Sequence, residues 1–176
     1  ETYRQMLVED GVTDEELLNG VKSVIRTRKF ANMPRYAELL EAMRGNPDDK
    51  AIIALKQAED AVSRFGMYKS VIFEDKALQA TIEGFFTNGW IDFCQQCGNE
   101  EWKFQKIEFV KLYKAYLKQD KKPKGDYLVG WCQHQNEISG IETEPENVYL
   151  VGYQQAPYCL PAPIVKELIK KQTPSI

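Results

Sequence analysis

Helix-start signals recur along this sequence and constrain its fold more than any other feature. A capping box, Thr13 to Glu16, precedes apolar residues at helical spacing. Further on, Asn46-Pro47-Asp48-Asp49 combines an N-cap residue, a proline suited to the first helical position and two carboxylates that favour the positive end of a helix dipole. The sequence therefore predicts a mainly α protein, a multi-helix bundle.

The apolar periodicity gives the approximate extent of each expected helix. The expected helices cover residues 14–28, 34–43, 46–65, 75–86, 89–94, 101–118 and 163–171, and the chain already reads as helical at Glu1. The aromatic and β-branched run at 67–73 predicts an extended stretch. Core positions are expected on one face of each helix, and they include Ile52, Phe65, Phe86, Trp90, Ile107 and Phe109.

Three regions follow from these patterns. Residues 1–45 form an N-terminal helix–link–helix module, 46–120 a helical body, and 121–176 a tail that follows a polar linker. In the tail, Tyr127–Gln133 recurs as Tyr149–Gln155. The two β-forming copies predict two short extended stretches that pair with each other or lie along the helical body. Gly130 and Gly152 are expected to permit a close backbone approach or a bulge.

Composition excludes several classes of protein. With 23 Lys and Arg against 26 Asp and Glu, the formal charge is −3, so a globally basic nucleic-acid binder is excluded while a local basic patch is not. No apolar run reaches the roughly 18 residues of a membrane span. We therefore expect a cytoplasmic protein without a membrane partner. The chain begins at Glu1 without Met and shows no signal peptide, which suggests trimming or processing.

The sequence carries little that predicts catalysis. It has one histidine, and it lacks the phosphate-loop, dinucleotide, zinc-protease and serine-hydrolase motifs. Its acidic pairs, Asp48-Asp49, Glu74-Asp75 and Glu100-Glu101, stand at expected helix starts, where capping is their expected role. We therefore predict that the protein is not an enzyme and carries no cofactor.

The four cysteines are the exception to this prediction, because they could form a metal site or a redox pair. A zinc site would join Cys94, Cys97, Cys132 and His134, because thiolates and imidazole suit tetrahedral zinc. Alternatively, Cys94 and Cys97 form a redox pair, or Cys94 is a small core residue at a helix end. The C-x-x-C motif is not repeated, which favours the core interpretation over metal binding.

A basic cluster surrounds the N-terminal link and makes nucleic-acid binding an alternative function. Its members are Arg26, Arg28, Lys29, Arg35 and Arg44. A helix-turn-helix would present them to phosphates, whereas the simpler interpretation is a solvated helix face. Glu38 and Glu41 on the second helix oppose phosphate binding.

Several motifs resemble an uncharacterised family of phage and prophage proteins, a domain of unknown function. The most specific is Gly66–Asp75, which matches the pattern G-x-Y-x-S-V-x-F-[DE]-D. Others are Thr13–Leu17, Met33-Pro34, Asn88-Gly89-Trp90, Cys94 and Phe109–Tyr113, with Asn88 in place of a glycine of the family pattern. The resemblance implies a mostly helical fold and a phage context, and no known activity.

Residues 1–45 also resemble the N-terminal domains of phage helicase loaders, in which a helix, a basic link, a proline and a second helix recur. This resemblance implies a replicative helicase as partner. The nine Tyr, eight Phe and three Trp are residue types that protein interfaces use. We therefore predict a non-enzymatic protein-interaction module, with phage DNA replication as its context. Nucleic-acid binding and zinc binding are the alternatives.

Overall fold

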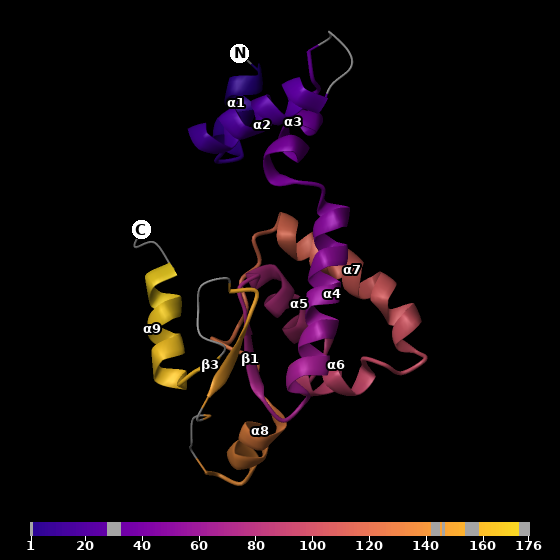
Figure 1. Ribbon diagram of the computed structural model, residues 1–176, viewed down its shortest axis with the longest axis vertical. Coiled ribbons are helices and arrows are strands. Elements are labelled where there is room, and N and C mark those ends of the chain that lie inside the picture. Colours follow the sequence, from indigo (N-terminus) through magenta and orange to yellow (C-terminus); the bar gives the residue numbers. More distant parts are fainter. Residues whose placement is uncertain (1, 28–32, 142–144, 146, 154–158, 173–176) are drawn as a thin grey trace. The chain divides into compact units, whose positions relative to one another are not determined.

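Figure 1 shows the computed structural model of the chain, which describes residues 2–27, 33–141, 145, 147–153 and 159–172. The chain divides into two compact units, Glu1–Lys50 and Ala51–Ile176. Most described residues are helical, and a small mixed sheet of three strands lies in the second unit. The prediction of a mainly α fold with short extended stretches is confirmed.

Unit 1 consists of three short helices, α1 (Thr2–Glu9), α2 (Asp14–Thr27) and α3 (Tyr36–Arg44). The predicted capping box begins α2: the Glu16 N–H donates to Thr13 Oγ1 (3.3 Å), and the Thr13 N–H donates to Glu16 Oε2 (3.0 Å). Helix α2 packs against α3, where Gly20 lies directly against the Met43 side chain. A glycine at this point brings the two helices close together.

Unit 2 consists of the three-stranded sheet and, among its described residues, six further helices that lie around it. Its elements, in order, are α4 (Pro47–Phe65, of which residues 47–50 belong to unit 1), β1 (Ser70–Phe73), α5 (Lys76–Phe85), α6 (Trp90–Gln96), α7 (Trp102–Lys118), α8 (Trp131–Ile138), β2 (Val148–Val151), β3 (Cys159–Leu160) and α9 (Ala162–Gln172). Strand β2 pairs parallel to β1 and antiparallel to β3. The sheet therefore joins the predicted body to the predicted tail, and both belong to unit 2.

The sheet separates two hydrophobic clusters, because side chains alternate between the faces of a strand. Val71 and Phe73 of β1 face the cluster formed with α4, α5, α6 and α7. Ile72, between them, faces a smaller cluster that includes Val165 of α9. Figure 1 shows α9 on one side of the sheet and α4 to α7 on the other.

Aromatic rings fill the larger cluster. The Phe93 ring lies 5.4 Å from that of Trp102 and 5.8 Å from that of Phe109, measured between ring centroids. Trp90 is fully buried, and its indole N–H donates to the Gly66 carbonyl (3.1 Å). The predicted core positions Phe86, Trp90 and Phe109 are confirmed as buried, while Phe65 is half-buried against the cluster.

Two predicted core positions are wrong. Ile52 of α4 is 63% exposed, and the buried row of that helix consists of alanines, Ala51, Ala54, Ala58 and Ala61. Alanines at this spacing form a helical face as regular as that of the larger residues, and their small side chains allow closer packing. Ile107 of α7 is 59% exposed, because Trp102, Phe109 and Tyr113 form the buried row of that helix.

The duplicated segment adopts two different structures. Leu128 of the first copy forms an antiparallel bridge with Val71, and Tyr149 of the second copy is the parallel partner of the same residue. The copies therefore lie on opposite edges of β1 and do not pair with each other, which corrects that part of the prediction. After Gly130 the first copy continues into α8, a helix that the sequence analysis missed. Gln154 and Gln155 lie outside the described residues.

Both glycines of the repeat permit close approaches, as predicted. A Cβ at Gly130 would lie 2.5 Å from the Lys69 carbonyl carbon and 2.7 Å from the Tyr68 carbonyl oxygen. At Gly152, which has φ +92°, a Cβ would lie 2.6 Å from Gln57 Nε2. The obstacle at Gly130 is backbone, which cannot move aside without displacing β1.

Asp75 fixes the junction between β1 and α5. Its Oδ1 accepts from the Leu78 N–H (3.0 Å), which caps α5, and its Oδ2 accepts from the Tyr113 hydroxyl of α7 (2.7 Å). Burial, together with this bond to a carboxylate, raises the pKa of Tyr113 well above its usual range. One carboxylate thus joins a helix start to a second helix.

Gly130→Ala is predicted to destabilise unit 2 by about 3 kcal/mol, because its methyl group would overlap the backbone of residues 68 and 69. Gly140→Ala is the control: Gly140 has φ +73° and no atom within 4 Å of its Cβ position, so only backbone strain of about 1 kcal/mol is expected. Thermal and urea unfolding measure both variants. Equal losses would contradict the close approach at Gly130.

Asp75→Ala is predicted to cost about 3 kcal/mol, because it removes a helix cap and leaves a buried hydroxyl without its acceptor. Tyr113→Phe removes only the second bond and should cost about 1 kcal/mol. Urea unfolding of both single variants and of the double variant gives the coupling between them. Strictly additive losses would show that the two residues act independently.

Candidate functional site

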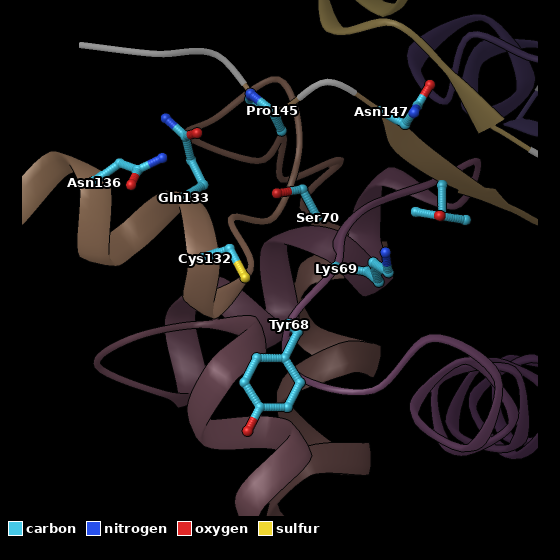
Figure 2. Close-up of a pocket in the computed structure, with 9 residues that line it drawn as sticks. Tyr68, Lys69, Ser70, Cys132, Gln133, Asn136, Pro145 and Asn147 are labelled. Atoms are coloured by element: carbon cyan, nitrogen blue, oxygen red, sulfur yellow. The ribbon is translucent and has the colours of Figure 1, made fainter. Parts of the chain in front are cut away.

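The start of β1 and the N-terminus of α8 form the walls of a pocket of about 230 Å³ (Figure 2). Two hydrogen bonds hold them together: the Trp131 N–H donates to the Met67 carbonyl (2.8 Å), and the Gly130 N–H donates to Ser70 Oγ (3.0 Å). The absence of a side chain at Gly130 permits this distance. The pocket therefore depends on the repeat glycine.

Polar side chains dominate the lining of this pocket. In Figure 2, Cys132, Gln133 and Asn136 project from α8, and Lys69 and Ser70 lie on the facing strand segment. The described residues that line it are Tyr68, Lys69, Ser70, Cys132, Gln133, Asn136, Pro145, Asn147 and Tyr149. Among the described lining residues, no carboxylate or imidazole lies beside the Cys132 thiol. Its amides and hydroxyls suit hydrogen bonding to a polar group.

Lys69 and Tyr149 connect this pocket to the core. The Lys69 amine lies 5.6 Å from the centroid of the Tyr149 ring, a cation–π distance. The Tyr149 ring also packs against Phe65 of α4, with centroids 5.0 Å apart. Because Tyr149 belongs to the second repeat copy and Cys132 and Gln133 to the first, both copies contribute to the pocket.

Cys94 and Cys97 stand at the end of α6, half-buried against the aromatic cluster. Burial, and to a lesser degree the nearby Cys97, raises the pKa of Cys94 to about 12. Burial and the Glu59 carboxylate also raise the pKa of Cys97. Raised values disfavour the thiolates that redox chemistry needs. Their position fits the core interpretation of Cys94.

Cys132 and His134 lie on α8, away from the C-x-x-C. Cys132 is exposed at the first pocket, while His134 is half-buried in a second pocket of about 370 Å³ with Glu83 and Glu137. Across the described residues, no three His, Cys, Asp or Glu side chains are arranged to hold a metal ion. The structure therefore does not assemble the ligand set that the sequence suggested.

The basic residues of unit 1 are only partly described, because Arg28 and Lys29 lie outside the described residues. Arg26 is exposed near the end of α2. The Arg44 guanidinium donates to the Asp10 carbonyl (2.6 Å), and the Arg35 N–H donates to Glu38 Oε2 (3.3 Å). Arg44 thus ties α3 to the end of α1, a structural role that the sequence did not suggest.

The exposed apolar rows of α2 and α7 were not predicted from the sequence. On α2, Leu18, Val21 and Ile25 are 54%, 37% and 73% exposed, although their periodicity suggested core positions. On α7, Phe104 is 78% exposed beside Ile107. On α7 the signal was present, because apolar residues lie on more than one side of that helix, whereas on α2 the exposed residues share one side with Leu17 and Val24.

Alkylation with iodoacetamide near pH 8 should distinguish the four thiols. Cys132 is exposed and should react first, whereas Cys94 should react roughly a hundredfold more slowly, because burial raises its pKa and limits access. Peptide mass spectrometry at timed intervals gives each rate, and the urea-unfolded chain, in which all four should react alike, is the control. Fast reaction of Cys94 in the folded protein would contradict its placement in the core.

No described helix combines the length and the apolar character needed to cross a membrane. No curated protein and no solved structure matches the chain significantly. A family match does exist, over residues 71–158, which is half of the chain. The match begins inside the Gly66–Asp75 stretch and includes α5 to α8 and β2. The chain therefore belongs to the family described as a domain of unknown function (DUF6475).

Proposed function

We propose that this chain is a non-enzymatic protein-interaction module. The resemblance of residues 1–45 to phage helicase loaders extends the proposal to a replicative helicase as partner, in phage DNA replication in the cytoplasm. The family match assigns no activity to the domain. The proposal therefore rests on the surface of unit 1, where the helix–link–helix lies.

One observation carries the proposal, the exposed row of Leu18, Val21 and Ile25 on α2. These residues are separated by three and four positions, so they share one side of the helix. Two turns of helix thus present a continuous apolar strip to solvent. A strip of this kind marks a contact surface more often than isolated apolar residues do.

The small core of unit 1 supports this interpretation. Within its described part, Leu39 and Gly20 are the buried positions, while Val8 and Met33 are 74% and 75% exposed. A unit of about 50 residues buries a small share of its surface, so each exposed apolar side chain is a large fraction of the core it could have formed. Binding a partner over α2 would bury the missing apolar area.

Substituting the strip should weaken partner binding. The triple variant Leu18→Gln, Val21→Gln, Ile25→Gln is predicted to weaken binding to the replicative helicase at least about tenfold, since interface energy is concentrated in a few apolar contacts. Titration calorimetry with purified helicase measures the affinity. The matched control, Glu15→Gln, Asn19→Gln, Lys22→Gln, changes three exposed residues on the same helix and should bind normally.

Two outcomes would replace this proposal. Helicase binding that is absent, or unchanged by the triple variant, would remove α2 as the contact. Salt-dependent binding to duplex DNA, weakened by Arg26→Gln and Arg35→Gln and unaffected by the strip, would favour the nucleic-acid alternative instead. Circular dichroism of each variant confirms that the helices are retained.

A further inference from the structure

Helix α7 of unit 2 carries a second exposed apolar feature on a basic background. Phe104 and Ile107 lie one turn apart and are 78% and 59% exposed. The same side of the helix carries Lys103, Lys111 and Lys118, all exposed. We name these five residues the α7 face. All of them lie in the stretch that matches the family.

The opposite side of α7 is fixed, so the α7 face cannot turn inward. Trp102, Phe109 and Tyr113 are between 1% and 3% exposed and belong to the aromatic cluster. The Trp102 indole N–H donates to Glu59 Oε1 (2.8 Å), and the Lys106 amine lies 2.7 Å from the same oxygen. Rotating the helix to bury Phe104 would expose these aromatics and break both contacts. The exposure of Phe104 is therefore built into the fold.

The charge of the α7 face determines which kind of partner can bind it. Helix α7 contains five lysines and one glutamate, in a chain whose formal charge is −3. The one glutamate, Glu108, pairs with Lys111 across 2.7 Å. Lys103 and Lys118 mark the two ends of the face, about 22 Å apart along the helix axis. A partner that covers the face meets positive charge at both ends and apolar side chains near one of them.

We propose that the α7 face docks an acidic amphipathic helix of a partner protein. Two apolar side chains of that helix, three or four residues apart, would pack against Phe104 and Ile107. Its carboxylates would meet Lys103 and Lys118, which requires about four helical turns. The proposal uses a different helix and a different unit from the α2 strip, so it stands independently of the proposed function.

Charge and shape favour an acidic protein segment over other anionic partners. Duplex DNA binds mainly through its phosphates, which gain nothing from an exposed Phe104 and Ile107 on this helix. A helix that lies in a membrane surface needs an apolar face along most of its length, whereas the apolar part of the α7 face is confined to about one turn. A protein helix can satisfy both the short apolar contact and the flanking charges.

The test uses the full chain and a fluorescent synthetic peptide of about 18 residues, long enough to form a helix when bound. Its contact side carries two leucines at i and i+4 flanked by glutamates, and a counterpart peptide has lysines in place of the glutamates. Fluorescence anisotropy should show that the acidic peptide binds at least about tenfold more tightly than the basic one. Adding salt should weaken the binding.

Variants locate the binding site. Phe104→Gln with Ile107→Gln should weaken binding of the acidic peptide at least about tenfold, and Lys103→Gln with Lys118→Gln should weaken it and reduce its salt dependence. Lys121→Gln with Lys122→Gln makes the same charge change outside the α7 face and should leave the affinity unchanged. The triple variant of α2 should also bind normally. Unchanged melting temperatures show that the variants fold.

Four results would overturn the proposal. First, the two peptides bind equally, or neither binds. Second, the Phe104→Gln, Ile107→Gln variant binds the acidic peptide normally. Third, the chain binds duplex DNA, or vesicles of phosphatidylcholine and phosphatidylserine, more tightly than the acidic peptide and with the same dependence on the variants. Fourth, sedimentation experiments show that the chain self-associates through Phe104. The last result would make a second copy of the chain the occupant of the α7 face.

Discussion

The pairing of β1 on both of its edges is the constraint on which unit 2 depends. All four residues of this strand are buried. Val71 at its centre bridges to Leu128 on one edge and is the partner of Tyr149 on the other, while Phe73 and Ile72 face opposite clusters. A strand this short has stability only through such contacts. Helices α4 to α7, α8 and α9 are arranged around this strand.

The helices could be predicted from sequence because their signals are local. The capping box at Thr13 and the signal at Asn46 each mark a helix start within a few residues, and the structure places helices after both. The sheet could not be predicted in this way, because β1 and β2 are far apart in the chain and their register depends on packing. Helix α8 was missed because the local sequence of the repeat favours an extended form, whereas Gly130 lets the chain turn at β1.

For the candidate sites, too, the local sequence predicts some features, while tertiary contacts decide the others. The spacing of Cys94 and Cys97 is compatible with ligands and equally with a helix end, and only the burial of the thiols separates these interpretations. Exposure of Ile107 likewise depends on which of two apolar rows of α7 meets the core. Trp102 decides this, because its ring enters the aromatic cluster and its N–H finds Glu59. Such choices between faces are made by tertiary contacts, which a helical period does not encode.

On helix α7 one apolar row packs inside unit 2 and another remains in solvent. On α7 the inner row is held by ring contacts and by the bonds to Glu59, so the outer row is presented on a rigid support. A partner that binds a rigid face does not have to order it first, and less of the interaction free energy is lost to conformational entropy. On this rigid support, the short apolar contact of Phe104 and Ile107 would suffice for the proposed docking, with Lys103 and Lys118 setting the orientation.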